Sequence, residues 1–185
     1  MSNVVWWALL VVCLAFAVYA ANIIKNEKNV AISNGKALLF HGFEFIIPSW
    51  WTATLESENH ITYERTDTRY DWVSHFRWVG DTDQDLQSIF EKMAVERQLV
   101  FDEDTSIVQA PSMLKEIYEQ GIEALRIEGT ATEAQEHRVY YDVFLIKGDS
   151  GVLYLESRSS ILNGLLEGPF FEQAISKIKR IKKAH

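Results

Sequence analysis

Hydrophobic and polar positions divide the chain into an unbroken apolar run near its start and a longer part with alternating and amphipathic patterns. Residues 4–24 contain no charged side chain. About 21 residues at 1.5 Å per residue form a helix of roughly 31 Å, which crosses a hydrocarbon core of ~30 Å. Aromatic residues near both ends and lysines after the run are typical of a membrane interface. The residues expected to hold this anchor in the membrane are Trp6, Trp7, Tyr19, Lys25 and Lys28.

Two other interpretations of the apolar run stay open. A cleaved signal peptide has a basic start and a shorter apolar part, whereas residues 1–3 carry no Lys or Arg, although residues 18–20 resemble a cleavage site. A lipoprotein would be modified at Cys13, but a valine stands where a small residue belongs. A core helix would be apolar on one stripe rather than all round. The predicted organisation is a transmembrane helix at residues 1–25, a polar linker at 26–36 and a soluble domain at 37–185.

The side of the membrane on which the domain lies follows from a small charge bias. Lys25, Lys28 and Lys36 follow the helix, and only the α-amino group precedes it. The positive-inside rule then places the domain in the cytoplasm, although a large domain is translocated regardless of flanking charge. We expect a single-pass protein of a bacterial inner (cytoplasmic) membrane with a cytoplasmic domain, and the periplasmic side stays an alternative.

Within the domain, strand patterns alternate with amphipathic segments. Apolar residues at every second position predict strands, and apolar residues spaced by three and four predict helices. Strands are expected at residues 37–47, 52–55, 60–65, 72–80, 107–108, 122–132, 137–147 and 152–159. Helices are expected at residues 86–93, 113–119 and 165–181. The short connections predict the class α+β, a mainly antiparallel sheet flanked by helices and preceded by one transmembrane helix.

Composition narrows the partners of the domain. The only cysteine lies in the apolar run, so disulfides are not expected, and about 160 further residues suffice for one ordinary core. A net charge of −8 argues against nucleic acid or anionic lipid as the ligand of the whole domain. The basic residues at 177–183 are the exception. They suit the last turn of a helix, and a phosphate or lipid-headgroup contact is the alternative.

Three motifs invite a chemical interpretation, and each has a simpler one. The segment 148–151 matches the nucleophile tetrapeptide of trypsin-like proteases, but no matching His segment accompanies it, and it suits a hairpin turn. Calcium binding after Asp81 would need Gly and Glu where Leu86 and Lys92 stand, so the acids suit a helix N-terminus. The histidines are scattered, namely His41, His60, His75, His137 and His185. We therefore expect no enzyme, no catalytic residue, no cofactor and no metal.

Aromatic residues crowd the first third of the domain. Tyr63, Tyr70 and Phe76 accompany four tryptophans there, and most of these rings are expected in the core. Adjacent residues of an extended chain point to opposite sides, so one of the tryptophans at positions 50 and 51 is expected at the surface. Exposed Trp is typical of interface hot spots. The candidate interface residues are Trp50, Trp51, Trp72 and Trp78, with the loop at 48–52 as the contact surface.

The segment Phe43-Glu44-Phe45-Ile46-Ile47-Pro48-Ser49-Trp50 resembles the opening of PsbP-like and DcrB-like domains, and Gly121-Ile122-Glu123-Ala124 resembles a later strand start. The resemblance covers roughly residues 36–181. It implies an α/β/α sandwich without a shared active site, used by extrinsic photosystem subunits, exported lipoproteins and chaperones that cradle transmembrane segments of type VI secretion effectors. This chain departs from the pattern by carrying its own membrane span, so none of these roles transfers directly.

The sequence therefore predicts a membrane-anchored, non-catalytic accessory or assembly subunit of a larger membrane protein complex. The alternative is a tethered ligand-binding or chaperone-like module for hydrophobic clients. The partners expected are the bilayer and other protein subunits of a membrane complex, without nucleic acid.

Overall fold

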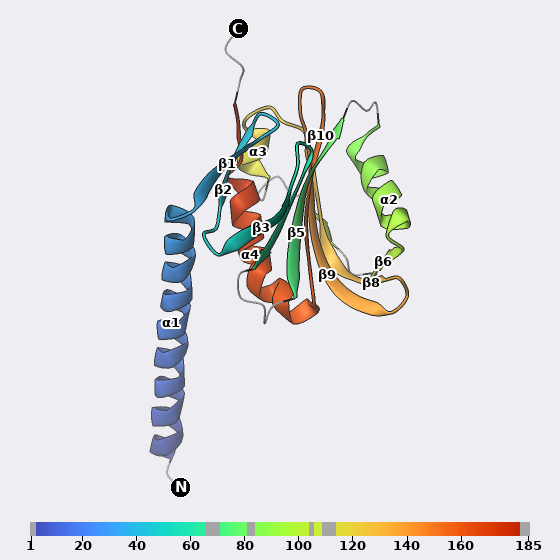
Figure 1. Cartoon of the computed structure of the whole chain (residues 1–185). Coiled ribbons are helices and arrows are strands. Elements are labelled where there is room, and N and C mark those ends of the chain that lie inside the picture. The colour runs from blue at the N-terminus through green and yellow to red at the C-terminus, as the bar shows by residue number, and fades with distance from the viewer. Residues whose placement is uncertain (1–2, 66–70, 81–83, 104–105, 109–113, 182–185) are drawn as a thin grey trace.

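The first element is a long helix that stands apart from the rest of the chain. The structure is a computed structural model that describes residues 3–65, 71–80, 84–103, 106–108 and 114–181 (Figure 1). Helix α1 spans Asn3–Ser33, and the described side chains of its apolar part are largely exposed. The predicted polar linker is therefore helical over most of its length. Only Asn34 and Gly35 separate α1 from the first strand.

An eight-stranded antiparallel sheet forms the centre of the domain, as the alternating patterns predict. Its strand order is β3-β4-β5-β10-β9-β8-β6, and β7 also pairs with β8. Strands β9 and β10 are joined by the hairpin at residues 148–151, where Gly148 N donates to Gly151 O at 2.8 Å. The strands are β3 Trp51–Glu56, β4 His60–Arg65, β5 Trp72–Gly80, β6 Leu99–Phe101, β7 Ser106–Val108, β8 Ala124–Glu133, β9 His137–Lys147 and β10 Gly151–Ser159.

A second, three-stranded sheet corrects two expectations. The segment expected as one strand is a hairpin of β1 (Lys36–Phe40) and β2 (Phe43–Ile47). His41 and Gly42 between them have positive φ angles of 47° and 81°, which suit the tight turn of such a hairpin. The chain end also differs, because Lys179–Arg180 forms strand β11 on β2. Lys177 and the two residues of β11 thus lie beyond the last turn of α4, and the lysines at 182 and 183 fall outside the described residues.

Helices cover both faces of the large sheet. Helix α4 (Ile161–Ser176) and the small sheet bury one face over a core rich in aromatic side chains. Helix α2 (Leu86–Glu96) packs on the other face, and its N-cap Asp85 accepts a hydrogen bond from Ser88 N at 2.9 Å. The short helix α3 (Lys115–Tyr118) leads into β8. The arrangement confirms the predicted α+β sandwich.

Candidate functional site

Most of the exposed large hydrophobic side chains of the described chain lie on α1. Within the described residues, Val5–Glu27 is one helix long and apolar enough to cross a membrane. Trp6, Trp7 and Tyr19 are between 63 % and 67 % exposed. Lys25 is also exposed, and the side chain of Lys28 lies outside the part of the chain that the structure describes. The roles predicted for these residues in a bilayer stay predictions.

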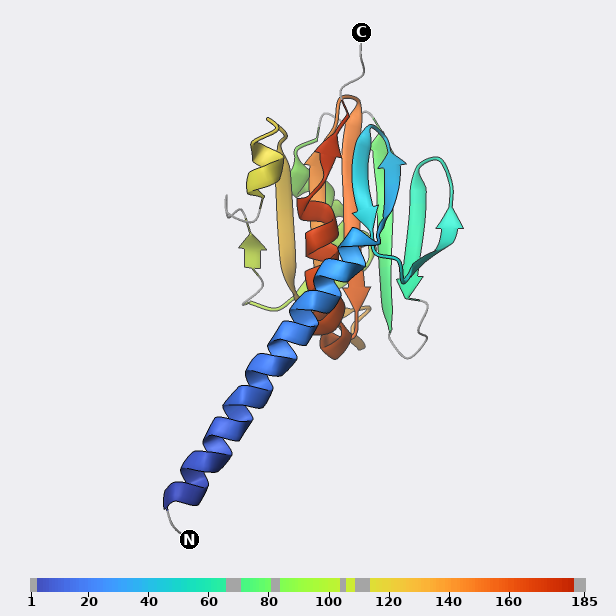
Figure 2. The same cartoon turned by 90° about the vertical axis from the view of Figure 1, so that its left-hand side faces the viewer.

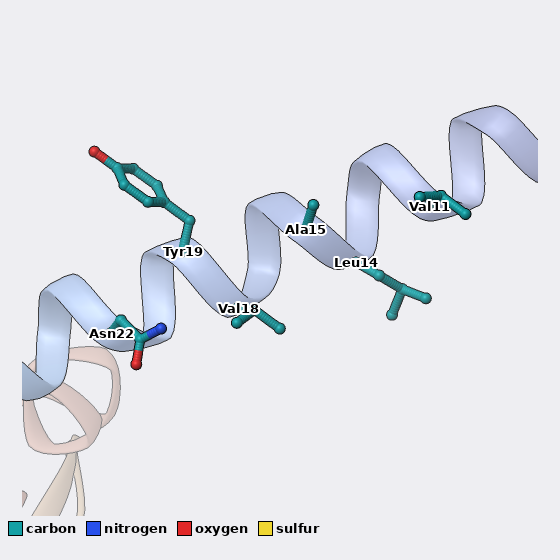
Figure 3. A pocket seen from close by; sticks show the side chains of 6 residues that line it. All are labelled: Val11, Leu14, Ala15, Val18, Tyr19 and Asn22. Carbon is teal, nitrogen blue, oxygen red and sulfur yellow. The ribbon is translucent and has the colours of Figure 1, made fainter.

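One face of α1 is hollowed into an open groove of about 590 Å³. Figure 3 shows the side chains of this face, with the methyl group of Ala15 between longer neighbours. A small residue lets a second helix approach closely, and the amide of Asn22 offers a hydrogen bond at one end of the groove. The groove is lined by aliphatic side chains, one tyrosine and one amide. Its lining residues are Val11, Leu14, Ala15, Val18, Tyr19 and Asn22.

The four tryptophans of the candidate interface separate into two buried and two half-buried side chains. Trp51 and Trp72 are 6 % and 3 % exposed, and their ring centroids lie 4.6 Å apart in the core. The Trp72 indole donates to Ser157 Oγ at 2.8 Å, and the Trp51 indole donates to Glu167. These two rings are core residues because the sheet and α4 enclose them. They offer no ring to a partner, which corrects the interface predicted from the sequence.

Trp50 and Trp78 lie at the rim of the same core. Trp50 meets Phe170 of α4 edge-on, with ring centroids 4.9 Å apart. Trp78 stacks in parallel on His41 at 4.5 Å. The prediction that one of two adjacent tryptophans faces outward thus agrees with the half-buried position of Trp50, and a contact of Trp50 or Trp78 with a partner stays a prediction.

Trp78 also explains the protease-like tetrapeptide. Its indole passes so close to Gly148 and Gly151 that a Cβ on either residue would lie 2.5–2.9 Å from the ring. The two glycines leave the space that this close contact requires. Ser150 is exposed at the tip, and among the described residues no histidine hydrogen-bonds to it. The segment is a hairpin turn.

A polar cluster lies beside α2 on strands β4 and β5. His75 Nδ1 lies 3.2 Å from His60 Nε2 and 3.1 Å from Thr62 Oγ1. Arg77 Nε donates to His60 Nε2 at 3.4 Å. Antiparallel pairing brings these side chains together, because His60 lies opposite Arg77 and Thr62 lies opposite His75. The sequence spacing of the histidines did not reveal this contact, which only the strand register creates.

The cluster continues into a buried ion pair on β10. Glu156 is fully buried, accepts a hydrogen bond from the Tyr154 hydroxyl at 2.8 Å and pairs with Arg97 at the end of α2. Burial lowers the pKa of Arg97, but the Glu156 carboxylate together with Tyr141 and Tyr154 more than offsets this and holds that pKa above its ordinary value. Burial and the same carboxylate raise the pKa of Tyr154. The charges satisfy one another and fix α2 to the sheet.

A groove of about 410 Å³ opens between α2, the start of β4 and the end of β5. Arg77, Lys92 and His60 bring basic groups to it, and Glu96 adds one carboxylate. Val79, Ile89 and Met93 give it apolar walls. This mixed lining suits a ligand with an apolar part and an anionic group.

The two histidines predict how stability depends on pH. Burial, followed by the charges of Arg77 and Arg97, lowers the pKa of His75 to about 4, against 6.5 in the unfolded chain. Between pH 6.5 and 4 the unfolded chain therefore binds a proton that the folded chain does not. As the pH falls from 6.5 to 4, we therefore expect the unfolding free energy to fall by about 1–2 kcal/mol. This value is reduced for the partial exposure of the His75 ring.

Chemical unfolding of the full chain in mild detergent at several pH values measures this slope. His75→Gln should flatten the slope, whereas His137→Gln, at an exposed position outside the cluster, should leave it unchanged. Equal slopes for wild type and His75→Gln would contradict the assignment.

A buried ion pair on the opposite face also escaped the sequence patterns. Arg126 on β8 is 1 % exposed and donates from Nε and Nη2 to the fully buried Asp142 on β9 at 2.9 and 2.8 Å. Glu128 and Glu172 lie 3.1 and 3.3 Å from the same guanidinium group. Burial raises the pKa of Asp142, and the two hydrogen bonds from Arg126 oppose that rise.

The described residues hold no group of three or more His, Cys, Asp or Glu side chains arranged to bind a metal ion. His41 and His137 lie away from the cluster of His60 and His75, and His185 falls outside the described residues. The buried carboxylates of Asp142, Glu156 and Glu167 are each paired with an arginine. Such pairs hold elements together, because their charges already have partners.

Comparisons with family models and with curated protein sequences give no match. Among solved structures, the cyanobacterial PsbP protein (CyanoP) of Synechocystis sp. PCC 6803 superposes with a TM-score of 0.53 at 9 % identity, over 76 % of this chain and 87 % of that chain. The domain has the PsbP-like fold. This confirms, at the level of fold, the resemblance that the segment 43–50 indicated.

Two further structures align with the PsbP-like domain at lower TM-scores. PA94 of Pseudomonas aeruginosa, a protein of unknown function, gives 0.46 at 8 % identity over 77 % of this chain and 94 % of that chain. LpqN of Mycobacterium tuberculosis, which is involved in cell envelope biogenesis, gives 0.44 at 13 % identity over 79 % and 84 %. At such low identity a structural likeness shows the fold, and the function has to be argued from the residues of this chain.

Proposed function

We propose that this chain is a single-pass membrane-anchored, non-catalytic accessory or assembly subunit of a larger membrane protein complex. The observation that carries the proposal is the exposed apolar helix Val5–Glu27, which joins a domain whose core is closed without it. An apolar helix of this length costs free energy in water and is stable in a bilayer. The domain would then lie at the membrane surface.

The groove on α1 suggests how the chain meets another subunit. Transmembrane helices associate through close packing at small residues and through hydrogen bonds rather than through the hydrophobic effect. Ala15 and Asn22 lie on one face of α1 and supply both features. The internally paired charges of the domain support a binding role over catalysis.

Purification in mild detergent tests this proposal. We expect the full-length chain to migrate with other proteins in a defined assembly. Ala15→Phe would fill the groove and should lower recovery of the partners about tenfold, equivalent to ~1.4 kcal/mol. Ala20→Phe makes the same change on the opposite face of α1, because five residues turn the helix by about 140° beyond one full turn. It should leave recovery unchanged. A lone wild-type monomer, or equal losses for both variants, would contradict the proposal.

The groove beside α2 favours a second candidate, a tethered ligand-binding module. Its apolar walls and the basic groups of Arg77 and Lys92 suit an amphipathic anion such as a fatty acid. Decanoate added to the full-length chain should shift the methyl NMR signals of Val79 and Met93, which line the groove, and Arg77→Gln should weaken the effect. An unchanged spectrum at saturating decanoate would remove this candidate.

A further inference from the structure

The outer face of α4 carries apolar side chains that nothing in the described chain covers. Leu162 and Leu166 are 76 % and 53 % exposed, one helical turn apart. Phe170 continues this stripe by a further turn and is half-buried against Trp50. The opposite face of α4 holds the core through Phe171 and its neighbours. The two leucines are therefore the free end of an apolar stripe.

This end of α4 carries no charge. The residues at positions 161–166 are Ile, Leu, Asn, Gly, Leu and Leu, and the first charged residue, Glu167, is fully buried. By contrast, Val95 on α2 is as exposed as Leu162, but the exposed Glu96 follows it. Helix α2 also packs on the other face of the large sheet from α4. An exposed leucine pair without flanking charge suits an apolar environment rather than water.

The position of this end relative to α1 indicates what that environment is. In Figures 1 and 2 the first turns of α4 lie at the end of the domain that points toward the N-terminus of α1, while β11 lies at the other end. The apolar stretch of α1 ends at Glu27, and only residues 28–33, about 9 Å of helix, separate it from the end of α1. Because α1 is one continuous helix, its last turns hold the start of the domain about 9 Å from the end of the apolar stretch.

We infer that the first two turns of α4 form a second membrane contact, in which Leu162 and Leu166 enter the interfacial region of the bilayer that α1 crosses. This inference rests on the proposed membrane anchor. The contact is driven by apolar surface, so it should be insensitive to the content of anionic lipid. With α1, it fixes the tilt of the domain on the membrane.

The single cysteine makes a direct test practical. The full-length chain is reconstituted in phosphatidylcholine vesicles and labelled with an environment-sensitive fluorophore at Cys13, which lies within α1. In a Cys13→Ala background the same label is attached through Leu162→Cys or through the matched control Val95→Cys, at positions of equal exposure. Lipids brominated either near the headgroup or near the middle of the acyl chain then report which labels touch the acyl region, the second kind serving Cys13 because it lies near the middle of the span.

We expect strong quenching at positions 13 and 162 and about threefold less at position 95, unchanged when phosphatidylserine is added. Leu166→Glu should reduce quenching at position 162 while the circular dichroism melting curve is retained.

Equal quenching at positions 162 and 95, with position 13 quenched, would overturn the inference and leave the anchor intact. A label at position 162 shielded from both lipid bromine and aqueous iodide would also overturn it, because protein would then cover the leucines. An unquenched label at Cys13 would overturn the proposed anchor itself.

Discussion

Replacing Arg126 with methionine is expected to lower the unfolding free energy of the domain by about 3–5 kcal/mol at neutral pH. Methionine fills much of the same space, so the loss comes from electrostatics. The carboxylate of Asp142, fully buried, would lose both hydrogen bonds that the structure gives it. A buried carboxylate without a partner costs far more than the pair contributes when intact.

The pH dependence separates this cause from a packing defect. Without the guanidinium group, the folded-state pKa of Asp142 should lie well above its unfolded value near 3.9, so the deficit should grow as pH rises through that pKa. At acid pH the protonated acid should remove most of the deficit.

Arg126→Met combined with Asp142→Leu should recover much of the loss at neutral pH, because neither charge is then buried. A deficit independent of pH, and unchanged in the double variant, would show that packing is responsible. Urea unfolding in mild detergent measures each value.

The strands could be predicted from the sequence because alternation is a local signal. The ranges 72–80 and 137–147 coincide with β5 and β9, and the turn at 148–151 lies where its glycines placed it. The break at His41 and Gly42 was missed because apolar residues flank it on both sides. Strand β11 was missed because Ile178 continues a helical spacing and packs in the core, although the backbone there is extended.

The side-chain clusters could not be predicted because they depend on pairing between strands. Arg126 and Asp142 stand in apolar alternating patterns 16 residues apart, and only the register of β8 with β9 makes them diagonal neighbours. For the tryptophans, the burial of the group could be predicted but not the burial of each residue. Composition indicated that most would be buried, but which ones depended on how α4 and the large sheet close over Trp51 and Trp72.

The glycines of α4 lead to the second prediction of large effect. Gly164 and Gly168 lie on the face of the helix that meets Tyr140 of β9. A Cβ at Gly164 would lie 2.4 Å from Cδ1 and 2.7 Å from Cβ of that tyrosine, whereas a Cβ at Gly168 would lie no closer than 3.6 Å to it. The stem of Tyr140 is fixed by the strand and cannot withdraw as a flexible side-chain end would.

Gly164→Ala should therefore lower the unfolding free energy by about 1–3 kcal/mol, because the helix must move away from the sheet. Gly168→Ala should raise it by up to ~1 kcal/mol, because alanine favours the helix and meets only an ordinary contact. Urea unfolding of the two variants in mild detergent gives the comparison. If both variants gained stability, α4 would not pack this closely on Tyr140.

Because Leu162 and Leu166 lie on the opposite face of the same turns, displacement of α4 by Gly164→Ala should also reduce lipid quenching at position 162. The packing of the glycines on the sheet would then determine which side chains the domain presents to the membrane.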